Sequence, residues 1–358
     1  MSSRWTHALA VSGMVLLTGP PVHVDAQGSA RQVGAGVPRM PDGHPDLQGT
    51  YDLNTLTPVV RPAGMPAVLT PEAAARLEAA VTESLSESEQ ALDANRSAPP
   101  AGGDGSPGAA GNVGGYNTFW LDPARTYMMV NGEIRTSLIV DPPAGRVPPM
   151  TAEGAARFAA QRNAASPDQP PVDDPGLGDP DSYNDPEQRP LGERCILGFG
   201  STSGPPALPN YFYNNLHQIV QTPGHILILS EMVHDVRIVR MKAEHLPAHM
   251  KFWMGDSVGH WEGDTLVVDT TNFNDKTRFR GSGEGLHVVE RFTRVDANNL
   301  LYQFTVEDPA TWVSPWSGEY VWPRTDDPIY EYACHENNYA LEGVLRGARF
   351  RESEDAKQ

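Results

Sequence analysis

The second half of the chain alternates apolar runs with short turns, and this pattern limits the folds open to it. In residues 194–349, the runs 216–222 and 225–230 are joined by Pro223 and Gly224, a turn pair that predicts a β-hairpin. Further strands are predicted at 258–261, 265–270, 286–295, 300–306, 318–322 and 330–334. Because successive hairpins build an antiparallel meander, we expect a mainly β fold closed as a barrel or folded as a sandwich, with a lipocalin-like barrel as one form.

Residues 27–194 are more irregular and contain two helix starts. Thr70, Pro71 and Glu72 supply an N-cap, a first-position proline and an acid in the first turn, and Thr151 begins a similar sequence. Short strands are predicted at 47–51, 116–120, 126–130 and 134–140. We expect this part, with two short accessory helices, to pack on an antiparallel β core at 195–349, followed by a tail at 350–358.

The sequence begins like a secretory signal peptide. Arg4 precedes an apolar run at 8–19, and Val24 and Ala26 stand where small residues precede a cleavage site. The apolar run has 12 residues, fewer than the about 20 that cross a bilayer, and no other stretch approaches that length. We therefore expect residues 1–26 to be removed and the mature chain to be periplasmic or secreted. The alternative is a frayed N-terminal helix of a cytosolic protein.

The charge of the chain bears on its partners. The formal net charge is −18, from 45 acidic and 27 basic residues. Nucleic-acid binding needs clustered Lys and Arg that neutralise phosphates, so this acidity argues against nucleic acid. The expected partner is a small-molecule ligand or substrate, and the sequence does not indicate an oligomeric state.

Two cysteines, Cys195 and Cys334, remain in the mature chain. In an oxidising compartment such a pair is expected to form a disulfide. The alternative is two buried thiols, because cysteine is among the most buried residue types.

Four segments of the sequence are distinctive. They are PDGHPDL at 41–47, GHWEGDTLVV at 259–268, ERF at 290–292 and YEYACHE at 330–336. These segments resemble those of an uncharacterised family of exported bacterial proteins, and the resemblance covers most of the mature chain. It implies export and a single shared domain, and it brings no activity with it.

His234 is the first candidate catalytic residue, because it lies three residues after Glu231. On a helix this spacing places an acid and a histidine on one face, as in the metal sites of helical bundles. The flanking sequence instead predicts strand, turn and strand, which separates the two side chains. We therefore consider His234 as a general base with Glu231 or Glu290 as its partner. The simpler interpretation is a histidine that is hydrogen-bonded at a hairpin.

Charged residues within predicted strands raise a second question. Glu290 lies in VVERFTRV, Arg135 in IRTSLIV and Arg237 in DVRIV, and a charge that turns inward must be paired. Arginines inside a barrel would bind the anionic group of a substrate. Equally, they would form salt bridges with Glu231, Glu290 or Glu331 that hold the barrel together.

Aromatic and amide side chains near predicted strand ends are candidates for a ligand-binding mouth. We assign Tyr116 and Trp316 to this role, with Asn117, Asn214 and Asn215 as hydrogen-bond partners, since rings and amides commonly line small-molecule sites. Large rings near turns also serve as core residues.

No cofactor or metal is expected. Cys334, His335 and Glu336 are adjacent, but adjacent residues alternate in direction along a strand, and no histidine pair has the HExxH spacing of a zinc site. A metal gathered from distant residues stays open.

Two hypotheses follow. The first is a cofactor-free hydrolase or lyase that acts on a small anionic or sugar-like organic substrate in a barrel pocket. The second is a noncatalytic, lipocalin-like carrier of a small ligand. The charges within predicted strands favour the enzyme, because a carrier of apolar ligands needs few of them.

Overall fold

The computed structural model describes residues 36–88, 122–163, 183–198, 203–210, 213–277, 279–336 and 338–357. The predicted signal peptide at 1–26 and the predicted strand at 116–120 lie outside these residues. So do Tyr116, Asn117 and the side chain of His234.

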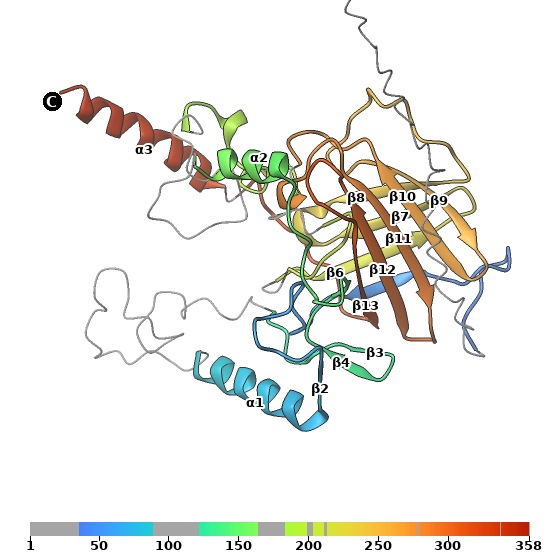
Figure 1. The fold of residues 1–358 in the computed structure, drawn as a ribbon. Helices are drawn as coiled ribbons and strands as arrows, with labels where there is room; N and C mark the ends of the chain where they lie inside the picture. Colours follow the sequence, from blue (N-terminus) through green and yellow to red (C-terminus); the bar gives the residue numbers. More distant parts are fainter. Residues whose placement is uncertain are drawn as a thin grey trace, which may run out of the picture. The chain divides into compact units, whose positions relative to one another are not determined.

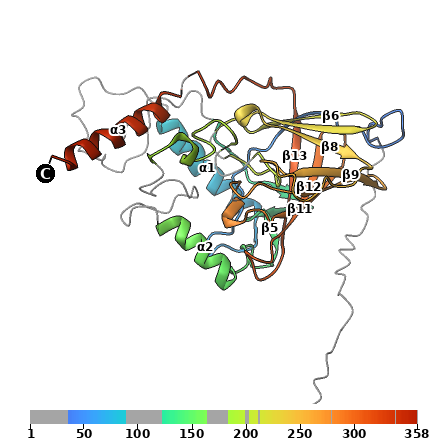
Figure 2. The ribbon, with the colours of Figure 1, turned by 90° about the horizontal axis from the view of Figure 1, so that it is seen from above.

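Within the described residues, nine strands form a closed barrel (Figures 1 and 2), which confirms the predicted fold class. The strands are β1 (Gly49–Asp52), β6 (Leu216–Gln221), β7 (His225–Ser230), β8 (Val236–Met241), β9 (Asp256–Glu262), β10 (Thr265–Thr271), β11 (His287–Arg294), β12 (Asn299–Glu307) and β13 (Trp316–Thr325). Neighbours pair in this order, and β1 also pairs with β13, which closes the sheet.

One pair of neighbouring strands departs from the predicted antiparallel meander. β8 and β9 are parallel, with Val239 opposite Ser257 and Met241 opposite Gly259. A parallel pair needs a connection that returns the chain to the end at which the first strand began. Residues 242–255 make that connection.

Short elements accompany the barrel. β5 (Ile139–Asp141) pairs with the start of β13, and β2 (Val68–Leu69), β4 (Glu133–Arg135) and β3 (Met129–Val130) form a small separate sheet. Helices α1 (Pro71–Ser88) and α2 (Ala152–Asn163) begin where the sequence predicts them. The hydroxyl of Thr70 accepts from Ala73 N at 3.2 Å, and that of Thr151 accepts from Gly154 N at 2.9 Å, so both threonines act as N-caps. Short 3₁₀ turns lie at Pro186–Gln188, Met232–His234 and Phe279–Gly281.

The segment after the barrel differs from the sequence prediction in two ways. Residues 330–334 are not a strand, because β13 already pairs with β12 on one edge and with β5 and β1 on the other. A third helix, α3 (Tyr339–Asp355), spans the predicted end of the β core and part of the predicted tail. Asn338 caps it by accepting from Leu341 N at 3.4 Å.

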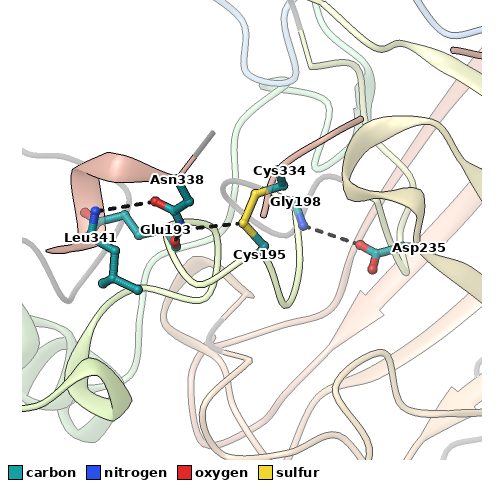
Figure 3. The surroundings of a disulfide bond; sticks show 7 residues. All are labelled: Glu193, Cys195, Gly198, Asp235, Cys334, Asn338 and Leu341. Carbon is teal, nitrogen blue, oxygen red and sulfur yellow. Dashed lines mark hydrogen bonds between the residues drawn. A yellow bond between two sulfur atoms is a disulfide. The ribbon is translucent and has the colours of Figure 1, made fainter. Parts of the chain in front are cut away.

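Cys195 and Cys334 form a disulfide (Figure 3), as predicted, with Cα atoms 5.8 Å apart. Asn338 Nδ2 donates to Glu193 O at 2.6 Å and contacts Cys195 Sγ at 3.5 Å. The bond therefore fixes the turn at 191–197 to the chain that leads into α3.

Aromatic side chains occupy much of the barrel interior. Because side chains alternate along a strand, each inward position is followed by an outward one, and the even-numbered residues of β12 and β13 turn inward. Tyr302 and Trp322 lie with ring centroids 4.6 Å apart, and Phe292 meets Trp322 edge-on at 5.6 Å. The interior is thus largely a packed core, in which polar side chains stand out.

Candidate functional site

Five polar or charged side chains turn into the barrel from different strands. They belong to His217 (β6), Ser230 (β7), Arg237 (β8), Glu290 (β11) and Tyr302 (β12), and none is more than 3% exposed. Each shares its inward face with apolar neighbours two residues away, such as Ile219, Ile228 and Val288. Burying such groups is unfavourable unless they find partners.

Arg237, Glu290 and Tyr302 form one bonded group. Arg237 binds Glu290 through both terminal nitrogens, with Nη2 donating to Oε1 at 2.9 Å, and the Tyr302 hydroxyl donates to Oε1 at 2.7 Å. Burial lowers the pKa of Arg237, but the nearby Glu290 carboxylate more than offsets this and raises it. Both oxygens of Glu290 are engaged, so this carboxylate is placed as a structural partner of Arg237.

A segment of the chain itself enters the barrel beside this group. In residues 203–210, the backbone of Ala207 is fully buried; its N–H donates to the Tyr302 hydroxyl at 2.9 Å and its carbonyl accepts from the Tyr320 hydroxyl at 2.8 Å. The Arg237–Glu290 pair is thereby linked through Tyr302 to a segment that covers part of the interior.

His217 is fully buried, and burial lowers its pKa to about 4. The imidazole is therefore neutral near pH 7. Its Nδ1 lies 3.4 Å from the carbonyl oxygen of Asn215, which can only accept, so Nδ1 carries the proton and Nε2 presents a lone pair. The ring lies 5.5 Å from that of Trp322.

Five buried polar atoms in this region have no hydrogen-bond partner in the part of the chain that the structure describes. Four are Asn215 Nδ2, His217 Nε2, Ser230 Oγ and Arg237 Nε, and the fifth is Nε1 of Trp322, whose ring lies 5.5 Å from that of His217. His217 and Ser230 are directly opposite each other on β6 and β7, and the charge of Arg237 contributes to the low pKa of His217. We call Asn215, His217, Ser230 and Arg237 the His217 cluster. Since buried polar groups nearly always have partners, five such atoms together need an explanation.

Ser230 and Ser257 provide a matched test of this description. Ser257 Oγ shares a hydrogen bond of 2.8 Å with Thr270 Oγ1. In protein refolded from urea to remove any bound molecule, Ser257→Ala should lower the free energy of unfolding by about 1 kcal/mol. Ser230→Ala should change it by less than about 0.5 kcal/mol, because no bond within the chain is lost. Equal losses in urea titrations would mean that Ser230 has a partner in the folded chain.

The other predicted site residues lie elsewhere. Arg135 forms salt bridges with Glu319 and, at 3.3 Å, with Glu133. Glu319 lies opposite Gln303 and is one of the outward-facing residues of β13. Glu231 is 5% exposed and accepts from the backbone N–H groups of Leu216 at 3.4 Å and Tyr330 at 2.9 Å. Arg135 and Glu231 are therefore both bonded within the chain itself.

Trp316 and Asn214 are also placed by the structure. Trp316 is fully buried and packs edge-on against Phe304 and Trp312, at 5.8 and 5.9 Å, so it is a core residue. Asn214 adopts a left-handed backbone conformation with φ of 54°, and its carbonyl accepts from Asn210 Nδ2 at 2.7 Å. The structure thus brings Arg237 and Glu290 together and separates them from Arg135 and Trp316.

Sequence reasoning missed His217 and Ser230, although it included Asn215 among the amides of a ligand-binding mouth. The strand pattern contains a usable signal for His217, because it shares the parity of the buried Ile219 in LHQIVQ. The same holds for Ser230, which follows Ile226 and Ile228 in HILILS. Their lack of partners depends on distant contacts that no local pattern reveals.

A network of hydrogen-bonded, charged side chains lies outside the core. Asp269 accepts from His245 Nε2 at 2.8 Å and from His287 Nε2 at 2.9 Å, and His245 Nδ1 reaches Asp256 at 3.2 Å. Arg240 binds Asp256 at 2.9 Å. Since His245 belongs to the 242–255 connection, these bonds attach the connection to β9 and β10.

The stability that these charged side chains contribute should depend on pH. The hydrogen bond to Asp269 raises the pKa of His287 above 6.5; burial raises the pKa of Asp269, but the bonds from His287 and His245 outweigh it and bring that pKa below 3.8. The contribution of His287 is therefore present below its unfolded pKa and lost as pH rises through its higher folded pKa, and that of Asp269 is lost in acid.

His287→Gln should accordingly destabilise the protein more at about pH 5, where the histidine is charged in both states, than at about pH 9. Urea titrations at the two pH values measure the difference. His225→Gln, at the exposed β6–β7 hairpin, is the matched control. A loss for His287→Gln that is the same at both pH values would contradict the assignment.

A cleft of about 220 Å³ lies between two loops and α2. Its lining includes Arg157, Asp275, Glu284 and Asp308. Asp308 is 3% exposed and accepts from the hydroxyls of Ser282 and Thr311, each at 2.5 Å. These bonds brace the two loops against each other, so the cleft has a fixed floor.

Comparisons of the chain with protein-family models, with curated proteins and with solved structures found no match. Among the described residues, no group of three or more His, Cys, Asp or Glu side chains is arranged to hold a metal ion. None of the helices described is long and apolar enough to cross a membrane.

Proposed function

We propose that this chain is an exported barrel of a bacterial cell envelope that binds a small organic molecule in its interior. The observation that carries the proposal is the His217 cluster, in which four buried polar atoms have no partner in the described residues. A ligand that meets these atoms would remove the cost of burying them. The N-terminal sequence, the disulfide and the resemblance to exported proteins support export.

The hydrogen bonds of Glu231 and Glu290 favour binding without catalysis. Glu290 is bonded to Arg237 and Tyr302, and Glu231 accepts from two backbone N–H groups. In the enzyme hypothesis one of these carboxylates orients a catalytic histidine. Both already accept hydrogen bonds from the chain at each of their oxygens, and this favours a carrier.

Mass spectrometry tests the proposal. Protein purified from a periplasmic expression host is compared under native and denaturing conditions. We expect an organic adduct that denaturation releases, in an amount that Ser230→Ala reduces and Ser257→Ala does not. Identical native and denatured masses, or an adduct that Ser230→Ala leaves unchanged, would contradict interior binding at this cluster.

One observation favours a hydrolase as the second candidate. His217 is neutral with a lone pair on Nε2, and it is directly opposite Ser230, whose hydroxyl has no partner among the described residues. A serine hydroxyl beside a neutral imidazole is the arrangement used in nucleophilic catalysis. Turnover of p-nitrophenyl acetate that disappears in both Ser230→Ala and His217→Asn would favour this candidate over the carrier.

A further inference from the structure

The free atoms of the His217 cluster differ in what they can bond. Asn215 Oδ1 accepts from Asn210 N at 2.8 Å, which fixes the orientation of the amide and leaves Nδ2 as the free donor. Both terminal nitrogens of Arg237 bind Glu290, and Nε is its one nitrogen without a partner among the described residues. These two groups can only donate, and the Ser230 hydroxyl can donate as well. The cluster therefore presents up to three donors to a single kind of partner, a hydrogen-bond acceptor.

His217 supplies the complementary group. With its proton on Nδ1, facing the Asn215 carbonyl, the neutral imidazole has an acceptor at Nε2. A ligand that satisfies the whole cluster must therefore offer an acceptor and, next to it, one N–H or O–H donor. A carbonyl oxygen with a neighbouring N–H or O–H group meets this requirement.

The charges around the cluster favour an uncharged ligand. Arg237 is neutralised by Glu290, and both side chains are almost fully buried. A carboxylate placed here would be a buried charge without a counter-ion of its own, which is costly. This argues against the anionic group that the sequence predicts for Arg237.

The neighbouring side chains favour a ligand with a ring. Trp322 lies 5.5 Å from the imidazole of His217, and Tyr51 is opposite His217 on β1. Both aromatic residues are almost fully buried. Aromatic rings pack well against each other in offset or edge-on arrangements.

We propose that the His217 cluster binds the uncharged amide or protonated carboxylic acid group of a small aromatic molecule. Asn215 Nδ2, Ser230 Oγ and Arg237 Nε are the donors available to the two lone pairs of its carbonyl oxygen, and His217 Nε2 accepts from its N–H or O–H. This assignment rests on the proposed function, because it names the ligand class of the same interior site.

Three probes of similar shape test the assignment by isothermal titration. Benzamide has both groups, N,N-dimethylbenzamide keeps the carbonyl but has no N–H, and aniline, which is uncharged near pH 7, has N–H groups but no carbonyl. Benzamide should bind about tenfold more tightly than either, since one hydrogen bond is worth about 1 kcal/mol or somewhat more. Ser230→Ala should weaken benzamide binding severalfold, whereas Ser257→Ala, the matched control, should not.

The outcomes separate the ligand class from the proposed function. Tighter binding of N,N-dimethylbenzamide or aniline than of benzamide, or equal binding of the three, would overturn the amide assignment. If such binding still depends on Ser230, interior binding stands while its chemistry changes. Benzoate in place of benzamide is the charge control, and a preference for benzoate near pH 7 without proton uptake, seen as binding heats that do not depend on the buffer, would restore the anionic ligand. If none of the four probes binds and no adduct is retained in the mass measurement, both proposals fail.

Discussion

Replacing Arg237 by methionine is expected to lower the free energy of unfolding by about 3–5 kcal/mol. The substitution leaves the Glu290 carboxylate, which is fully buried, without its counter-ion. The Tyr302 hydroxyl still donates to Glu290, but one neutral hydrogen bond offsets only part of the cost of burying a charge. Urea unfolding followed by tryptophan fluorescence measures the loss.

The double variant Arg237→Met with Glu290→Leu shows whether the loss comes from the unpaired charge. It should recover most of the stability, because replacing both members of a buried ion pair by apolar side chains is often nearly neutral. About 1 kcal/mol should remain lost, since Tyr302 loses its acceptor. Arg291→Met, which breaks the partly exposed pair with Glu262 on the outside of the barrel, is the control and should cost about 1 kcal/mol or less. A double variant no more stable than Arg237→Met would contradict the assignment, as would a control loss equal to that of Arg237→Met.

Removing the disulfide is expected to have an effect of similar size. Cys195 and Cys334 are 139 residues apart in sequence, so their bond closes a long loop in the unfolded chain. The loss of chain entropy on closing a loop of this length corresponds to up to about 5 kcal/mol of stability. Cys195→Ser with Cys334→Ser should therefore lower the free energy of unfolding by several kcal/mol.

Reduction provides the internal control for this prediction. A reducing agent should destabilise the natural chain to the level of the double cysteine variant and should leave that variant unchanged. A natural chain whose unfolding midpoint does not respond to a reducing agent, although its thiols are shown to be free, would contradict the expected contribution.

Local sequence patterns predicted the elements whose contacts are near in sequence. The run 225–230 is β7, with its turn at Pro223 and Gly224, because alternation and a turn pair specify a hairpin. The N-cap and proline that begin α1 are likewise local. The position of α3 was not predicted, since Gly343 and Gly347 lower the helix propensity of its sequence and the helix is otherwise marked only by the Asn338 cap.

Contacts between distant segments explain the rest of the differences. The parallel pairing of β8 with β9 depends on the path of residues 242–255, for which no hairpin signal exists. For Arg237, a salt bridge with Glu290 was one of the predicted alternatives and is the one found, but the choice of a partner 53 positions away depends on contacts that no local pattern shows. Ser230 Oγ and His217 Nε2 lack partners because no described side chain of the neighbouring strands reaches them. This depends on how all the strands of the closed barrel are placed.

The binding of a ligand at the His217 cluster is tested most directly by the imidazole nitrogen NMR signals of His217, recorded with and without benzamide. A hydrogen bond to Nε2 changes the signal of that nitrogen. His245 and His287 belong to the charged network outside the core and serve as references in the same spectrum. We expect the His217 Nε2 signal to shift on addition of benzamide in the natural chain, to shift less in Ser230→Ala, and the two reference histidines to stay unchanged. An unchanged His217 signal under conditions in which benzamide is bound, or a shift confined to His245 and His287, would contradict interior binding.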